Sequence, residues 1–228
     1  GILYPDIQFH FLPLAISYDG KKDAGTHGFQ VHVGTKRAKS RGWVRLKSNN
    51  PLDSPKVCFN YMTEPQDWID MRACITLTRE IFAQNSFSDV IGDEIAPGIN
   101  CKTSDEMDQF IKDKVESAYH PCGTLRMGTD RRAVVDPQTM KLKGFDGLFV
   151  VDSSVMPQAT AGDLNTPTLM IAERAADLIK GEPLAEDIIA PIMGDYYWRE
   201  RQRSPEINHD FSSNRKDLKR LLKETNDL

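Results

Sequence analysis

The chain has 228 residues, of which 39% are hydrophobic, and this is ample for one globular domain and marginal for two. Its 29 basic and 33 acidic residues give a formal net charge of -4 without a long basic stripe, so nucleic acid is not an expected partner. No window holds the roughly 18 uninterrupted apolar residues that a membrane-spanning helix needs, although peripheral attachment to a membrane stays open.

The first residues also lack the basic start and apolar run of a signal peptide. The chain opens on Gly1 rather than on methionine, and we therefore expect it to be part of a longer polypeptide. Its cysteines form no C-x-x-C pair, which argues against a zinc site and does not suggest a disulfide framework. We expect these cysteines to be reduced and mostly structural.

Alternating apolar and polar residues predict strands in the first part of the chain, over residues 7–11, 30–33 and 43–47. Gly34 and Gly42 supply turn chemistry between the second and the third of these segments. This half is therefore expected to be rich in antiparallel strands.

Two helices are expected after these strands. Thr63 and Gln66 have the spacing of a capping box, and apolar residues follow at helical intervals from Trp68 to Phe82. A second helix is expected to begin at Ser104, whose hydroxyl can cap the helix ahead of two acidic residues.

The last third of the chain shows a strand pattern followed by a helix pattern. The apolar residues 148–151 end in Asp152, which predicts a buried strand of an α/β sheet whose C-terminal edge faces a ligand. Thr166 is a good N-cap, Pro167 fits the first helical turn, and Gly181 is expected to end that helix.

His120 is the most informative histidine on sequence grounds. It lies between an expected helix and a glycine-rich loop and is followed by Pro121, where a side chain can be aimed into a cavity. From the residues alone, a catalytic and a structural role have equal weight there. His10 and His32 lie on expected strands, where a hydrogen-bonded structural histidine is the more common case.

Ordered sequence blocks around these residues resemble the C-terminal signature of the glucose–methanol–choline oxidoreductases. The blocks are SAYHPCGT (117–124), MG (127–128), VVDP (134–137), VVDSSVMP (150–157), LNTPT (164–168) and IAERAAD (171–177). The upstream segments IQFHFLP (7–13) and HGFQVHVG (27–34) are similar to the choline-oxidising members of that family. The resemblance covers residues 2–183.

The resemblance implies an alcohol oxidation in which a hydride passes from the carbinol carbon to flavin N5 while a protein base accepts the hydroxyl proton. His120 matches the family's histidine, and an imidazole suits the role of proton acceptor near neutral pH. Asn165 matches the family's asparagine, whose amide can donate a hydrogen bond to the developing alkoxide. His10 and Tyr119 are expected to bind the substrate.

The resemblance also implies FAD as the cofactor, held in part by a set of residues around the expected strand end and helix start. The matching residues are Asp152, Ser153, Asn165, Thr166 and Pro167. The helix N-terminus would direct its amides at the flavin ring, and the protein would supply orientation and electric field for the cofactor's own chemistry. Asp152 has a structural alternative, in which it caps a turn or a helix.

Two departures from the family pattern limit these expectations. No G-x-G-x-x-G follows a strand, so the dinucleotide-binding fingerprint is absent and this chain alone is expected to bind flavin poorly and to be inactive. The missing N-terminal FAD-binding portion of the same protein is therefore an expected partner. Asp163 stands where a neutral asparagine is common; it could favour a cationic substrate or, as the preferred alternative, cap a turn.

The expected fold class is α+β and corresponds to a fragment of a two-domain fold. Residues 1–116 would form an antiparallel-sheet substrate domain with flanking helices. Residues 117–183 would return as the C-terminal segment of an α/β FAD-binding domain, and residues 184–228 would form a charged peripheral tail.

By resemblance, the complete protein oxidises choline to betaine aldehyde and passes electrons to a respiratory acceptor. One alternative is a family member that acts on another primary alcohol or polyol, and another is an inactive truncated module. Family relatives occur at bacterial membranes and in mitochondria, and both locations are retained as expectations.

Overall fold

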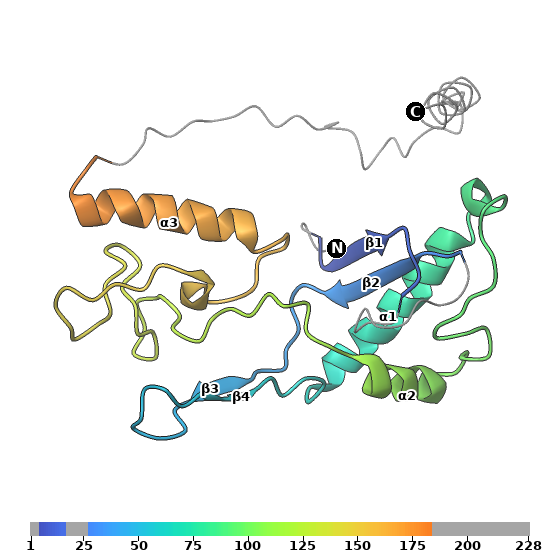
Figure 1. Cartoon of the computed structure of the whole chain (residues 1–228), viewed down its shortest axis with the longest axis horizontal. Helices are drawn as coiled ribbons and strands as arrows, with labels where there is room; N and C mark the ends of the chain where they lie inside the picture. The colour runs from blue at the N-terminus through green and yellow to red at the C-terminus, as the bar shows by residue number, and fades with distance from the viewer. Residues whose placement is uncertain (1–4, 17–26, 184–228) are drawn as a thin grey trace. The chain divides into compact units, whose positions relative to one another are not determined.

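The computed structural model describes residues 5–16 and 27–183, and all of these belong to one compact unit. The segment 184–228, for which we expected a charged tail, lies outside the described residues. Figure 1 shows small antiparallel ribbons and two helices in the first part of the unit, followed by loops and a third helix. The expected α+β class is confirmed, whereas the division at residue 116 stays a prediction.

Two antiparallel ribbons account for the strands of the described residues. β1 (Ile7–Leu12) pairs with β2 (Gln30–Thr35), with His10 opposite His32. β3 (Trp43–Arg45) pairs instead with β4 (Lys56–Cys58), and no strand joins the two ribbons in the part of the chain that is described. The expected antiparallel pairing is confirmed and is divided between two ribbons.

Gly42 allows the chain to enter the second ribbon, because a Cβ atom there would collide with the carbonyl oxygens of Cys58 and Phe59. A Gly42→Ala substitution is therefore expected to lower the free energy of unfolding by about 2 kcal/mol, as overpacking does. Urea unfolding of the full-length protein measures the effect. Gly34→Ala is the matched control, since a Cβ on Gly34 meets no atom within 4 Å; equal losses in both variants would contradict the steric explanation.

Helix α1 (Pro65–Phe82) begins where its sequence pattern predicts, but the expected capping box is wrong. Its N-cap is Glu64, which makes no side-chain cap hydrogen bond. The Thr63 hydroxyl donates to the carbonyl of Asn60 and so serves the preceding turn. Proline in the first turn of α1 suits a helix start, because its missing N–H needs no partner there.

Helix α2 (Ser104–Lys114) is capped one residue earlier than expected. The hydroxyl of Thr103 accepts from the amide of Glu106, and the Glu106 carboxylate accepts from the amide of Thr103 at 2.8 Å. The capping box that we assigned to α1 is thus found at α2. Ser104 is the first helical residue rather than the cap.

Helix α1 packs against β2 and α2 (Figure 1). The Phe82 ring lies 4.9 Å from that of Phe29, which precedes β2. An ion pair of 2.6 Å between Arg72 and Asp108 joins α1 to α2. These contacts fix α1 against the first ribbon and α2 against α1.

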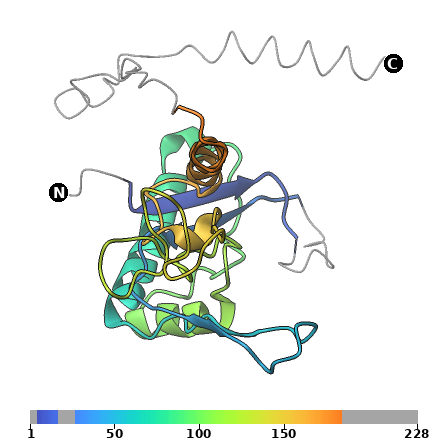
Figure 2. The same ribbon diagram turned by 90° about the vertical axis from the view of Figure 1, so that its left-hand side faces the viewer.

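The last part of the described chain has its own hydrophobic core, built by helix α3 (Asn165–Lys180), the short 3-10 helix η2 (Ser153–Val155) and the loops before η2. Figure 2 shows η2 among these loops. The core comprises Val135, Met140, Val155, Met156, Leu164, Ile171 and Ala175. The segment therefore has a packed core of its own.

The expected strand over residues 148–151 is wrong for the described structure. Phe149 forms only an isolated bridge with Lys141, and the Val150 amide donates to the carbonyl of Met140 at 3.1 Å. Val150 packs against the core, whereas 47% of Leu148 is exposed. Without a neighbouring strand to continue the ladder, this segment forms a local bridge.

Helix α3 begins two residues before the position that we predicted. Leu164 is its N-cap, without a side-chain cap bond, so the expected capping by Thr166 is wrong. Pro167 lies in the first turn as expected. The end is also confirmed, because Gly181 adopts the left-handed conformation with φ 73°.

Candidate active site

The loop that follows His120 is fixed to η2 through backbone hydrogen bonds. Gly123 and Leu125 donate to the carbonyls of Ser153 and Ser154 at 3.3 and 3.0 Å. The Ser153 hydroxyl donates to the carbonyl of Pro121 at 3.1 Å. The segment that carries His120 is therefore tied to the segment that starts at Asp152.

Gly123 is needed for this close approach. Its φ is 86°, and a Cβ atom would lie 3.1 Å from the carbonyl oxygen of Met156. A larger residue would be strained in that conformation and would push the loop away from η2. The glycine-rich sequence after His120 thus has a specific structural purpose.

One carboxylate links the two residues that we expected to be catalytic. The Oδ2 atom of Asp163 lies 3.5 Å from Nδ1 of His120, and its Oδ1 atom accepts from the amide of Asn165 at 2.8 Å. The side chains of His120 and Asp163 are 39% and 42% exposed. The structure therefore brings the His120 loop to the start of α3, where Asn165 is the first residue.

The electrostatics of the site centre on Asp163. Its pKa is lowered chiefly by the hydrogen bond from the Asn165 amide, and burial opposes this shift to a smaller extent. The positive charges of His120, Lys36 and His10 lower the pKa further. Asp163 thus stays ionised at neutral pH and faces basic groups from three separate segments.

The two residues expected to bind substrate have different surroundings. His10 lies on β1 and is near enough to Asp163 for its charge to act on that carboxylate. Tyr119 adopts φ 59°, its side chain is 72% exposed, and its amide donates to the hydroxyl of Ser117. His10 is thus near Asp163, and Tyr119 directly precedes His120 in the chain. Contact of either residue with a substrate stays a prediction.

The residues expected to hold the cofactor occur at η2 and at the start of α3. Asp152 caps η2, because its Oδ1 atom accepts from the amide of Ser154 at 2.8 Å. The hydroxyl of Ser154 is buried and has no hydrogen-bond partner among the described residues. Thr166 is exposed in the first turn of α3, and Pro167 is half-buried. The unpaired hydroxyl at η2 and the exposed first turn of α3 are each the kind of polar group that fits a negatively charged cofactor such as FAD.

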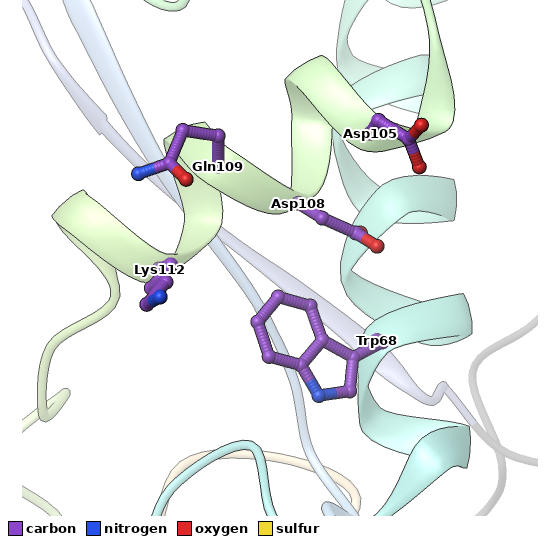
Figure 3. A pocket seen from close by; sticks show the side chains of 5 residues that line it. All are labelled: Trp68, Asp105, Asp108, Gln109 and Lys112. Carbon is purple, nitrogen blue, oxygen red and sulfur yellow. The ribbon is translucent and has the colours of Figure 1, made fainter.

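Other kinds of site have less support in the described residues. A hollow between α1 and α2 is lined by Trp68, Asp105, Asp108, Gln109 and Lys112 (Figure 3). The Asp108 carboxylate there is already paired with Arg72. Residues 5–16 and 27–183 contain no group of metal ligands and no helix able to cross a membrane.

Cysteine chemistry is also disfavoured. The four cysteines, Cys58, Cys74, Cys101 and Cys122, are free, as expected. Burial raises the pKa of the Cys74 thiol to about 11 and also raises that of Cys122. Because the thiolate is the reactive form, neither thiol is activated as a nucleophile at neutral pH.

Sequence reasoning missed the contact between Asp163 and His120. It gave Asp163 two alternatives, a cation-binding and a turn-capping role, and the hydrogen bond to the Asn165 amide supports the second. An aspartate whose carboxylate accepts from the amide two residues later is a recognisable turn signal. The approach of His120 depends on how the loop folds back, which local sequence does not encode.

The loop that carries His120 and the start of α3 thus lie close together around Asp163. The family model described as GMC oxidoreductase matches residues 38–172. The chain belongs to the GMC oxidoreductase family, whose members are FAD-dependent enzymes that act on CH–OH donors.

Curated relatives are named oxygen-dependent choline dehydrogenase. The protein from Brucella ovis is 54% identical over 188 residues, which are 81% of this chain and 34% of the relative. The protein from Rhizobium rhizogenes is 54% identical over 185 residues, with 80% and 34% covered. The chain thus spans about a third of the length of these relatives.

Solved structures support the same fold. Pyridoxine 4-oxidase from Mesorbium loti matches with a TM-score of 0.71 and 31% identity, over 79% of this chain and 35% of that protein. A formate oxidase matches with a TM-score of 0.71 and 26% identity, over 78% and 32%. These similarities agree with the small antiparallel ribbons and helices of the described residues.

Proposed function

We propose that this chain is the C-terminal part of an FAD-dependent dehydrogenase that oxidises choline to betaine aldehyde. The observation that carries the proposal is the carboxylate of Asp163, which contacts both His120 and the amide of Asn165 and so brings the two matched family positions together. The choice of choline is supported by the names of relatives that are 54% identical.

In this proposal, His120 accepts the proton of the substrate hydroxyl, and the Asn165 side chain donates a hydrogen bond to the oxygen as it gains negative charge. His10 and Tyr119 bind the substrate beside them. These groups act on one oxygen atom, which requires the loop and the helix start to be held close together. The hydrogen bonds between the loop and η2 supply that rigidity.

The cofactor would be held by Asp152, Ser153, Asn165, Thr166 and Pro167, together with the rest of the protein. When bound, FAD supplies the acceptor for the hydride of the alcohol. The buried hydroxyl of Ser154 and the N-terminus of α3 support this placement.

The N-terminal FAD-binding portion of the same protein is the proposed partner of this chain. Leu169, Met170 and Ile179 of α3 are 57%, 59% and 49% exposed, although the opposite side of α3 is in the core. Apolar residues on a helix that already packs by another face support contact with a further part of the protein. In this division, residues 1–116 form the substrate domain and residues 117–183 complete the FAD-binding domain.

The test is choline-dependent reduction of an artificial electron acceptor by the full-length protein. Saturable turnover with choline, and much weaker turnover with neutral primary alcohols and polyols, is the expected result. Preference for a neutral alcohol would favour the second candidate, a family member with another substrate. Bound flavin without turnover of any alcohol would favour an inactive module.

The electron acceptor and the location need separate measurements. The relatives are named oxygen-dependent, whereas the resemblance to the family led us to expect a respiratory acceptor. Parallel assays with a quinone analogue and with oxygen, each following product formation, distinguish these acceptors. Fractionation of cells tests the proposed association with a bacterial or mitochondrial membrane.

A further inference from the structure

Asp163 is a carboxylate with two different partners, one on each oxygen atom. Its Oδ1 atom accepts the amide hydrogen bond of Asn165 at 2.8 Å, which orders the start of α3. Its Oδ2 atom faces Nδ1 of His120 at 3.5 Å, within the range of an ion pair. A capping role explains the contact with the Asn165 amide but does not explain the contact with His120.

We propose that Asp163 is a positioning residue for His120, whose imidazole it orients through Nδ1 and whose positive charge it stabilises after proton transfer. The proposal rests on the proposed role of His120 as the base. With Nδ1–H directed at the carboxylate, Nε2 carries the free lone pair and is directed at the substrate hydroxyl. The proton leaves the hydroxyl oxygen for Nε2, and the resulting imidazolium stays paired with Asp163.

The surroundings of Asp163 suit this role better than direct binding of a cationic substrate. His120, Lys36 and His10 are the charged or titratable groups whose charges act on the carboxylate. They approach it from the loop after α2, from the end of β2 and from β1. A carboxylate that already faces these basic groups has less unbalanced negative charge to offer to an ammonium group.

The decisive variant is Asp163→Asn, which removes the charge and keeps an oxygen that can accept from the Asn165 amide. In the full-length enzyme we expect kcat to fall about tenfold, since a less well oriented and less stabilised base transfers the proton more slowly. The acid-side midpoint of the pH profile of kcat/KM is expected to move down, because the negative charge that stabilises the imidazolium is lost. KM for choline is expected to change less than kcat.

A measurement independent of turnover is the NMR titration of histidine-labelled full-length protein, with the His120 signal assigned from its loss in His120→Asn. The His120 midpoint is expected to move down in Asp163→Asn by the same amount as the kinetic midpoint. The NMR titration tests the interaction between Asp163 and His120 even if choline is not the substrate. Failure of the proposed function would therefore be distinguishable from failure of this inference.

Asp136→Asn is the matched control, because Asp136 also caps a turn. Its carboxylate accepts from the amides of Gln138 and Thr139 at 2.9 Å, and these bonds lower its pKa as the Asn165 bond does for Asp163. This variant should leave both midpoints unchanged. Asp163→Ala, which also removes the cap, should show the midpoint shift with a loss of stability.

Two results would overturn the inference. Unchanged midpoints in Asp163→Asn, with defects only in Asp163→Ala, would assign Asp163 a capping role alone. A rise in KM that is specific to choline, with unchanged midpoints, would assign it to binding of the substrate cation.

Discussion

Substituting His120 by asparagine is expected to lower kcat for alcohol oxidation by about 10³-fold, because the variant lacks the group that accepts the hydroxyl proton. Asparagine keeps a polar side chain at an exposed position, so the loop and its hydrogen bonds to η2 should persist. The flavin absorbance spectrum and the flavin content of the purified full-length protein should stay at the wild-type values. Steady-state assays with an artificial acceptor measure the loss.

The matched control is His27→Asn, which removes an exposed histidine that has no place in the proposed site. It should retain wild-type kcat and KM. Raising the pH should not rescue His120→Asn unless hydroxide replaces the base. If His120→Asn kept more than a tenth of the wild-type kcat, His120 would not be the principal proton acceptor.

The sequence predicted the helices and the first ribbon well because their periodic patterns are local properties. It predicted helix caps poorly, since a hydroxyl near a helix start can bond to several neighbours. Thr63 bonds to the preceding turn, whereas Thr103 forms the capping box that its spacing with Glu106 allows. Which hydroxyl caps a helix thus depends on the conformation of the preceding turn.

The candidate site was predicted from resemblance rather than from local pattern. His120 and Asn165 lie far apart in the chain, and their common neighbour Asp163 brings them close only after the loop, η2 and α3 have packed around one core. Asp163 was recognised as a possible cap, but its approach to His120 follows from tertiary folding. The prediction of a strand over residues 148–151 was wrong because a run of apolar residues indicates burial but does not determine whether a neighbouring strand pairs with it.

Asp67 is expected to have the largest effect on stability among the substitutions considered. It lies on α1, is 2% exposed, and accepts from the amides of Lys39 and Ser40 at 2.6 and 2.8 Å and from the Ser40 hydroxyl. Asp67→Ala leaves these donors without their acceptor, so the free energy of unfolding should fall by about 3 kcal/mol. Urea unfolding of the full-length protein measures the change.

Asp70→Ala is the control on the same helix. Asp70 accepts from the side chain of Gln66 at 2.8 Å, an exposed contact within the helix. Its loss should cost less than about 0.5 kcal/mol. Similar losses at Asp67 and Asp70 would show that the buried hydrogen bonds of Asp67 contribute little.

The same carboxylate should make stability depend on pH. Burial raises the pKa of Asp67, but the hydrogen bonds from Lys39 and Ser40 outweigh burial, and its pKa is lowered overall. A lowered folded-state pKa contributes stability above the unfolded value of about 4, and this contribution is lost as the pH falls through the folded-state pKa. The stability difference between wild type and Asp67→Asn should therefore shrink in acid.

The segment that Asp67 holds is also connected to the candidate site. The segment held by Asp67 begins near Lys36, whose positive charge acts on Asp163. If Asp67 fixes that segment, Asp67→Asn should alter the acid-side midpoint of kcat/KM slightly, through the changed distance from Lys36 to Asp163. A shift smaller than that of Asp163→Asn is expected, because the direct contact with His120 is preserved.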